Sequence, residues 1–333
     1  MDPIITPKIS VLMPVYNCRP FIEESVNSIL NQTFADFEFL IIDDCSTDGT
    51  YEFLQSLTDA RIKLIRKEEN SGISESLNMG IDLARGEYIA RMDGDDISLV
   101  TRFEEQFQIM SMNSEMVVCG SWLKILGTEK VYQNPETHEK ILFSLLKSNP
   151  IAHPSVMFRK SVLASLKYDK TKEPAEDYEL WTRLVFEGGF YNIQKPLLIY
   201  RQHEAAISCR NAKIQFQQYL YARIQLYKKL NYNNLIYTDD LLMKYFVSDT
   251  AMTTKQFKLI MQWVFELSNL NSATNIFPQL EFTKLINKSL NRFIKDFFEV
   301  HKFSLKGFAC LTLLSRRQLA IVLKLYYNSF IPR

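Results

Sequence analysis

ISVLMPV, from Ile9 to Val15, is the stretch of this 333-residue chain that most clearly predicts its fold. Its apolar residues do not alternate with polar ones, which is typical of a strand buried on both faces of a parallel sheet. Similar short runs follow it as far as about Gly120, and they are Phe39–Ile42, Ile62–Ile65, Tyr88–Ala90 and Met116–Cys119. Five buried strands are enough for a doubly wound sheet.

Segments with helical periodicity separate these runs. Apolar residues recur on one helical face at Phe21, Ile22, Val26, Ile29 and Leu30, and again at Phe103, Phe107 and Met110. This alternation predicts an α/β domain over residues 1–207, with a mostly parallel, doubly wound sheet and flanking helices. From about Asn211 the sequence is aromatic, lysine-rich and helical in period, which predicts a mainly helical region over residues 208–333.

The composition limits the classes of function. With 39 basic and 38 acidic residues the net charge is +1, so no overall field would attract nucleic acid, and none is expected as a partner. The five cysteines are scattered without metal or disulfide spacing, which favours a reducing cytoplasm. The first eight residues do not resemble a secretory signal, and no uncharged apolar run approaches the roughly 20 residues of a membrane span.

Three loops that follow predicted strands contain clustered polar residues. They are Pro14-Val15-Tyr16-Asn17 after the first strand, Asp43 to Gly49 after the second and Asp93-Gly94-Asp95-Asp96 after the fourth. Ligands of open α/β sheets bind beyond the carboxyl ends of the strands, so a binding site is expected here.

The third loop places three carboxylates within four residues, which repel one another unless a cation is present. Oxygen ligands of this kind suit Mg²⁺ or Mn²⁺, ions that bridge substrate phosphates. A solvated turn is the alternative for this loop. A turn with an N-capping residue is the alternative for Asp43 to Gly49, because Asp, Ser and Gly favour such positions.

The segment PAEDYELW, from Pro174 to Trp181, predicts the start of a helix. Asp177 lies in its first turn, where the positive end of the helix dipole favours an ionised carboxylate. A general base needs that ionised form. Simple N-terminal capping is the alternative role for Asp177.

Taken together, the ordered motifs resemble the family 2 glycosyltransferases of GT-A fold, in particular bacterial members that build polysaccharides. The motifs are KISVLMPVYN (8–17), IDDCSTDGT (42–50), NSG (70–72), Asn78, ARMDGDD (90–96) and EDYELW (176–181). They extend over roughly residues 8–205. The first-strand loop lacks the glycines of a sugar nucleotidyltransferase, and no GxGxxG or Walker motif occurs in the sequence.

The resemblance implies a role for each candidate residue. The donor nucleotide would be held by Pro14, Val15, Tyr16, Asn17, Asp44, Asn70 and Asp93. The cation would be held by Asp95 and His203, although spacing does not decide between Asp95 and Asp96. Asp177 would be the catalytic base. His153 would either shape the acceptor pocket or simply pack in the core.

The implied reaction moves a hexose or N-acetylhexosamine from a UDP-sugar to an acceptor hydroxyl, with Mn²⁺ or Mg²⁺ and with inversion. The acceptor would be a glycan that is growing or is linked to a polyprenyl diphosphate at the cytoplasmic face of the inner membrane. The alternatives are a sugar nucleotidyltransferase and an inactive sugar-binding relative, which would be expected to have lost Asp93, Asp95 or Asp177.

The last segment, residues 302–333, has six basic residues and no acidic one. Its high apolar content is compatible with a helix lying in the interface of an anionic membrane. The alternative is a helical hairpin that packs on the catalytic domain or on a second copy in a homo-oligomer.

Overall fold

The computed structural model describes residues 6–203, 212–301 and 304–330. The chain forms two compact units, Met1–Tyr219 and Leu220–Arg333, and the division lies within helix α9 (Ala212–Lys228). The boundary expected between residues 207 and 208 falls in the segment 204–211, outside the described residues.

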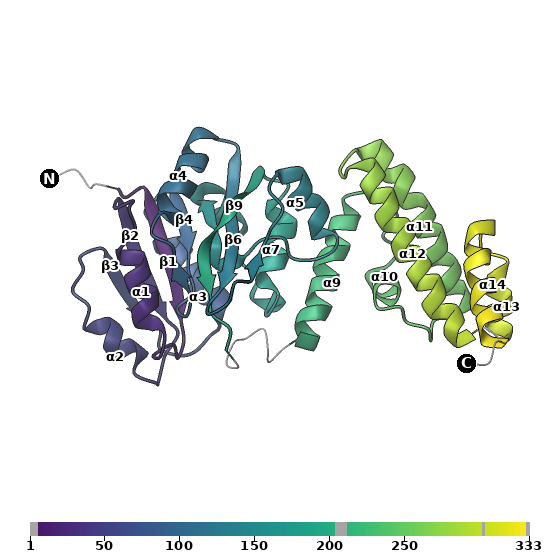
Figure 1. Cartoon of the computed structure of the whole chain (residues 1–333), viewed down its shortest axis with the longest axis horizontal. Helices are drawn as coiled ribbons and strands as arrows, with labels where there is room; N and C mark the ends of the chain where they lie inside the picture. Colours follow the sequence, from purple (N-terminus) through teal and green to yellow (C-terminus); the bar gives the residue numbers. More distant parts are fainter. Residues whose placement is uncertain (1–5, 204–211, 302–303, 331–333) are drawn as a thin grey trace. The chain divides into compact units, whose positions relative to one another are not determined.

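Within the described residues, the first unit is built on one nine-stranded sheet (Figure 1). The strands are β1 (Ile9–Val15), β2 (Phe37–Asp43), β3 (Ile62–Arg66), β4 (Tyr88–Arg91), β5 (Ile97–Ser98), β6 (Met116–Ile125), β7 (Val131–Tyr132), β8 (Met157–Arg159) and β9 (Gly189–Tyr200). Their order is β3-β2-β1-β4-β8-β6-β9-β5, and β7 pairs with β6.

The five predicted strands correspond to β1, β2, β3, β4 and β6, and the position of each is confirmed. The expectation that all five are buried is wrong for β3, which lies at the edge of the sheet and is half-exposed. Strands β3, β2, β1 and β4 pair in parallel, as the apolar runs predicted. Strand β8 is antiparallel to both β4 and β6, and β5 is antiparallel to β9, so the second half of the sheet is mixed. Strand β6 nevertheless runs in the same direction as β4, because both are antiparallel to β8, which lies between them.

Helices flank the sheet (Figure 1). They are α1 (Ile22–Leu30), α2 (Thr50–Gln55), α3 (Ile73–Leu83), α4 (Arg102–Met112), α5 (His138–Leu145), α6 (Lys160–Leu166) and α7 (Glu176–Leu184). The predicted stripes on α1 and α4 pack into one core with alternate residues of β1, except that Phe21 precedes α1 and lies outside this core. Helix α3 contacts β1 and β2, and its Gly80 lies against Leu12 on the opposite face.

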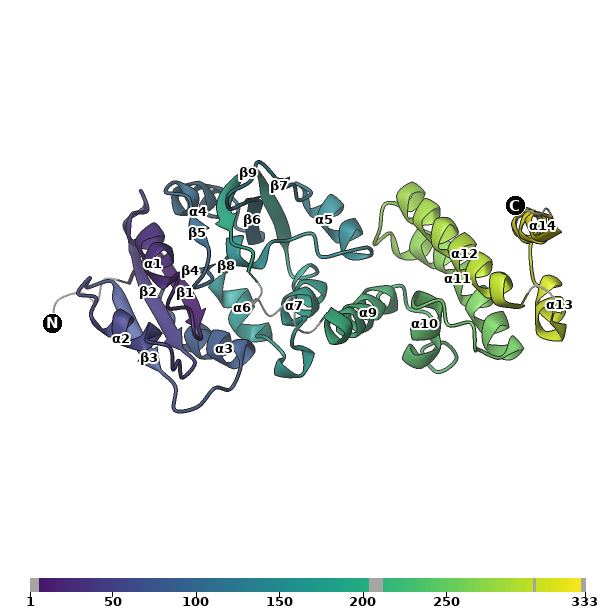
Figure 2. The same cartoon turned by 60° about the horizontal axis from the view of Figure 1, so that its bottom comes forward.

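The second unit is helical, as predicted, and its ribbon is also seen in Figure 2. Its further helices are α10 (Asp239–Phe246), α11 (Thr254–Thr274), α12 (Gln279–His301), α13 (Leu305–Leu311) and α14 (Arg316–Phe330). Aromatic rings fill its core: Trp263 contacts Tyr227 and Tyr245, and Phe257 stacks on Phe293. In the part of the chain that the structure describes, no helix combines the length and apolar character that a membrane span requires.

Candidate active site

The loop after β1 is fastened to the loop after β2. The Asn17 backbone N–H donates to Ser46 Oγ over 3.0 Å, and the Thr47 N–H donates to Asn17 Oδ1 over 2.9 Å. Asn17 adopts a positive φ of 53°, which asparagine tolerates better than most residues. Tyr16 is nearly half exposed, so Tyr16 and Asn17 present polar groups at the carboxyl edge of the sheet.

Pro14 and Val15 are the last two residues of β1 and are buried, rather than exposed in the loop. The acidic loop packs directly on this strand end, because a Cβ built at Gly94 would lie only 2.8 Å from Val15 Cγ1. Glycine at position 94 therefore allows the loop 93–96 to approach β1 closely.

The Asp44 side chain is engaged within the protein. Its carboxylate accepts hydrogen bonds from the N–H groups of Ser71 and Gly72, each over 3.0 Å, and pairs with Lys67 Nζ at 2.6 Å. Asp44 therefore fixes the loop between β3 and α3. Asn70 lies in that loop with its side chain exposed, and it does not contact Asp44 in any hydrogen bond found among the described residues.

The three carboxylates of the acidic loop do converge. Asp93, Asp95 and Asp96 each place one oxygen within 4.8 Å of the others. Asp93 is held by Arg91, whose two terminal nitrogens lie 2.6 and 2.5 Å from its two oxygens. Burial and the charge of Asp95 raise the pKa of Asp93 to about 6, although Arg91 partly offsets this.

Asp96 is the fully buried member of the cluster. One of its oxygens accepts a hydrogen bond from the Arg201 N–H over 2.9 Å, and the other has no hydrogen-bond partner among the described residues. Burial, with the charges of Asp93 and Asp95, raises the pKa of Asp96 well above its usual range. A buried carboxylate oxygen without a donor is costly unless a cation or a proton compensates it.

The segment that follows β9 closes over the acidic loop. His203 Nε2 lies 2.8 Å from Asp95 Oδ2, and Arg201 Nε donates to the Asp95 carbonyl over 2.9 Å. The His203 ring also packs on Phe21, with 4.9 Å between the ring centroids. The structure thus brings His203 to Asp95, a residue 108 positions earlier.

This cluster fits a divalent cation. It offers three carboxylates of the type that Mg²⁺ and Mn²⁺ prefer, and one of them, Asp96, has a buried oxygen without a protein donor among the described residues. Burial raises the pKa of Asp93 and Asp96 most, and the charges of the neighbouring aspartates add to it; a bound cation would relieve that repulsion.

Asp177 lies in the first turn of α7, as predicted. Asn149 Nδ2 donates to Asp177 Oδ2 over 2.7 Å, and the Tyr178 N–H donates to Asp177 Oδ1 over 2.6 Å. Burial raises the pKa of Asp177 above its usual value, while these two hydrogen bonds act in the opposite direction. A carboxylate with a raised pKa is a stronger base and accepts a proton more readily.

The neighbouring Glu176 is buried, and its Oε2 has no partner among the described residues. Burial, followed by the charge of Asp177, raises the pKa of Glu176 to about 8. Two coupled acids in one pocket share their protons. Glu176 is therefore the member of the pair that binds a proton more readily, because its Oε2 accepts no hydrogen bond whereas Asp177 accepts two.

Arg91 connects the two groups of acids. Its side chain is almost fully buried, and its charge lowers the pKa of both Asp93 and Asp177. The charge of Asp177 in turn raises the pKa of Asp93, after the larger effect of burial, so the acids of the loop and of α7 are close enough to interact. The sequence reasoning gave Arg91 no role. The sequence feature that could have indicated Arg91 is its position as a charged residue at the end of an otherwise apolar strand.

His153 is buried and packs in the core. Its Nε2 lies 2.7 Å from the Tyr168 hydroxyl oxygen, and its ring contacts Trp181 edge-on. Burial lowers the pKa of His153 well below its usual value, which keeps the ring neutral. These contacts support the packing alternative for His153.

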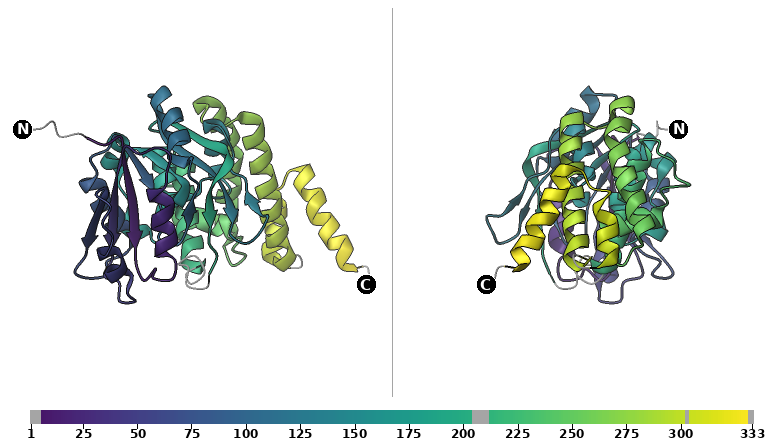
Figure 3. Two further views of the ribbon diagram at one scale, coloured as in Figure 1. Left: turned by 60° about the vertical axis from the view of Figure 1, so that its left-hand side comes forward. Right: turned by 90° about the vertical axis from the view of Figure 1, so that its right-hand side faces the viewer.

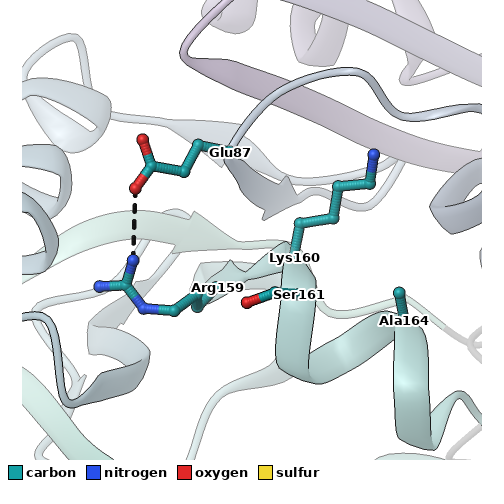
Figure 4. A pocket seen from close by; sticks show the side chains of 5 residues that line it. All are labelled: Glu87, Arg159, Lys160, Ser161 and Ala164. Atoms are coloured by element: carbon teal, nitrogen blue, oxygen red, sulfur yellow. Dashed lines mark hydrogen bonds and ion pairs between the residues drawn. The ribbon is translucent and has the colours of Figure 1, made fainter.

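A separate surface pocket is lined by Glu87, Arg159, Lys160, Ser161 and Ala164 (Figure 4). Glu87 immediately precedes β4, whereas the acidic loop follows the end of β4. The pocket therefore lies at the opposite end of that strand from the acidic cluster, and Arg159 within it is paired with Glu87.

Comparison with known proteins shows the family of the chain. Residues 10–179 match the sequence profile of Glycosyl transferase family 2, and the chain belongs to this family of glycosyltransferases. Putative glycosyltransferase EpsE of Bacillus subtilis is 32% identical over 65% of this chain and 86% of its own. O-antigen biosynthesis glycosyltransferase WbnJ of Escherichia coli is 31% identical over 68% of this chain and 92% of its own.

One further relative and one solved structure extend the comparison. The Escherichia coli protein WfgD is named as a UDP-Glc:alpha-D-GlcNAc-diphosphoundecaprenol beta-1,3-glucosyltransferase, and it is 29% identical over 62% of this chain and 81% of its own. The structure of S. aureus TarS residues 1–349 with UDP-GlcNAc superposes with a TM-score of 0.59 at 19% identity, covering 89% of this chain and 90% of that one. This likeness shows the GT-A fold.

Proposed function

We propose that the chain transfers a hexose or N-acetylhexosamine from a UDP-sugar to an acceptor hydroxyl with inversion of the anomeric centre. The observation that carries the proposal is the convergence of the carboxylates Asp93, Asp95 and Asp96 on a site that also feels the charge of Asp177. The carboxylates of the acidic loop suit a cation that neutralises the departing diphosphate, and Asp177 suits the deprotonation of the attacking hydroxyl.

The donor is proposed to bind across the carboxyl ends of β1, β2 and β4. Tyr16 and Asn17 contact the nucleotide from the loop after β1, and the backbone of Pro14 and Val15 forms the floor beneath them. Asp93 contacts the ribose. Asp44 and Asn70 are assigned to the donor site because Asp44 fixes the loop between β3 and α3, which contains Asn70. The UDP-GlcNAc named with TarS supports a uridine nucleotide.

Asp95 and Asp96, with His203 beside Asp95, are proposed to hold Mn²⁺ or Mg²⁺. When bound, such an ion supplies positive charge to a diphosphate leaving group. Arg91 orients Asp93 through two hydrogen bonds and lowers the local negative charge. The cation and Arg91 would together allow an anionic donor to bind beside a loop that is itself acidic.

Asp177 is proposed to accept the proton of the acceptor hydroxyl as that oxygen attacks the anomeric carbon and the bond to the diphosphate breaks. Asn149 and the Tyr178 N–H orient the carboxylate, and Glu176 stays protonated beside it. A single displacement of this kind inverts the configuration. The acceptor named for WfgD, a sugar on a polyprenyl diphosphate, supports a lipid-linked or growing surface glycan as the acceptor class.

The test of the proposed function is an assay of the purified chain with Mn²⁺, a panel of UDP-hexoses and UDP-N-acetylhexosamines, and sugar diphosphate lipids as acceptors. We expect UDP release that depends on the acceptor, and a β-linked product from an α-linked donor by NMR. A product that retains the α configuration would contradict the role of Asp177. If no donor in the panel is bound or hydrolysed, the alternative of an inactive sugar-binding relative is favoured.

Asn149 offers a prediction about pH. Its hydrogen bond lowers the pKa of Asp177 against the effect of burial, so Asn149→Ala should raise that pKa further. The acid limb of the kcat profile should then move to higher pH, with several-fold lower activity at pH values on that limb and a smaller loss on the plateau. The measurement is kcat against pH. Asn287→Ala, at an exposed position of α12, should leave the profile unchanged.

A further inference from the structure

The two units of this chain have opposite net charges, which the overall charge of +1 conceals. Residues 220–333 contain 16 basic and 7 acidic residues, a net charge of +9, whereas residues 1–219 carry a net charge of −8. No acidic residue follows Glu299 in the sequence. A charge difference of this size between two units is a reason to look for an anionic partner of the helical unit.

The outward face of α13 is apolar. Leu305, Phe308 and Ala309 are exposed at positions i, i+3 and i+4, and Leu305 is 91% exposed. An amphipathic helix normally buries such a stripe. Residues 302–303, immediately before α13, lie outside the described part of the chain.

The orientation of α13 is fixed by packing on its other side. Gly307 and Cys310 are buried, and a Cβ at Gly307 would lie 2.0 Å from the His301 carbonyl oxygen. The helix is N-capped by Ser304, whose hydroxyl accepts the Gly307 N–H over 3.0 Å. A rotation that buried Leu305 and Phe308 would therefore break a close contact with the end of α12. The apolar stripe has to face outward.

Two exposed basic residues follow this stripe in the sequence. Arg316 and Arg317 begin α14, both are exposed, and neither has a side-chain partner among the described residues. Leu323 is exposed on the same helix, while Gln318 and Val322 face inward. Figure 3 shows α13 and α14 in yellow, next to the helices α11 and α12 that they contact.

Helix α12 adds a second row of cations. Lys284, Lys288, Arg292 and Lys295 are all exposed and recur on the side opposite its buried residues. No ion pair involves any of the four within the described residues. Glu281 and Glu299, near the two ends of the helix, are the exposed acidic residues of α12, and the half-buried Asp296 lies four residues after Arg292.

We propose that the helical unit binds the surface of an anionic phospholipid bilayer, with Leu305 and Phe308 of α13 entering the interface and Arg316 and Arg317 contacting the headgroups. Apolar side chains that enter the acyl boundary beside cations that pair with anionic lipid are the combination that interfacial helices use. A nucleic acid would use the cations but would leave the apolar stripe exposed. This inference does not depend on the proposed reaction, because its test does not measure transfer.

The test is co-sedimentation of the full chain with vesicles of phosphatidylglycerol and phosphatidylcholine, compared with vesicles of phosphatidylcholine alone, at low and high salt. We expect binding to the anionic vesicles that weakens with salt, and little binding to the neutral ones. Leu305→Ser with Phe308→Ser should lower the partition coefficient by about tenfold or more, because two exposed apolar side chains would no longer be buried.

Arg316→Gln with Arg317→Gln should lower binding by about thirtyfold, since each basic residue near an anionic surface contributes about 1 kcal/mol. Matched controls remove similar groups from the other unit. Met112→Ser removes an apolar side chain that is 78% exposed, and Lys140→Gln with Lys213→Gln removes two exposed charges. The controls should bind like the unaltered chain.

Other outcomes would overturn the inference. Equal binding to neutral vesicles, or unchanged binding by the α13 variant, would exclude this surface as the membrane contact. Tighter binding to duplex DNA than to anionic vesicles would assign the cations to nucleic acid. A dimer in analytical ultracentrifugation that Leu305→Ser with Phe308→Ser dissociates, without vesicle binding by the original chain, would show that a second copy covers the stripe.

Discussion

Asp177→Asn is expected to reduce turnover by at least about 10²-fold, the scale on which a positioned general base acts. The amide keeps the shape of the side chain, but it cannot accept the proton of the acceptor hydroxyl. Because the donor is proposed to bind on the loops after β1, β2 and β4, its affinity should change little. The measurement is kcat with saturating acceptor, together with the dissociation constant of UDP from calorimetry.

Glu187→Gln is the matched control for Asp177→Asn. It makes the same chemical change just beyond the other end of α7, at an exposed position, and should leave kcat unchanged. A second measurement separates the base from a merely structural role: the donor should still be hydrolysed slowly by water in the variant. Loss of UDP binding with unchanged turnover of bound donor would show that Asp177 acts on the donor instead.

Asp95→Ala is expected to lower transfer by at least about 10²-fold, because the departing diphosphate would lose positive charge worth several kcal/mol. EDTA should abolish the activity of the unaltered chain, and added Mn²⁺ should restore it. Direct titration with Mn²⁺, followed by electron paramagnetic resonance, should show weaker binding by the variant.

Asp36→Ala removes an exposed acid from the same unit and should change neither activity nor Mn²⁺ binding. His203→Ala refines the assignment of ligands. If His203 holds the cation, this variant should weaken Mn²⁺ binding as Asp95→Ala does. Full activity in excess chelator would contradict the cation site as a whole, whatever the individual variants do.

Several parts of the candidate site could be predicted from local sequence. Asp93, Asp95 and Asp177 lie where their motifs place them, directly after β4 and in the first turn of α7. A strand end and a helix start are encoded within a few residues, by apolar runs and by Pro, Asp and Glu at defined positions. The structural contacts of Asp44 were not predictable in this way, because they depend on the path of the loop after β3.

The partners of these acids could not be read from the sequence. Asn149 donates to Asp177 from 28 residues away, and Arg201 donates to Asp96 from 105 residues away. Nothing in the composition near Asn149 or Arg201 distinguishes them from other polar residues in loops. Their roles arise when β8 and β9 bring distant loops to one edge of the sheet.

The sequence by itself determined the fold class, the positions of the first strands along the chain, the position of the acidic loop and the basic character of the last segment. These features depend on periodicity and composition, which act over a few residues or over the sum of charges. The tertiary structure alone decided that β8 inserts antiparallel between β4 and β6, that Asp96 is buried, that Arg91 serves two groups of acids and that α13 turns its apolar face outward. The physical reason is that burial and charge pairing depend on which segments pack together, and close packing at positions such as Gly94 and Gly307 selects one arrangement from many that the local pattern allows.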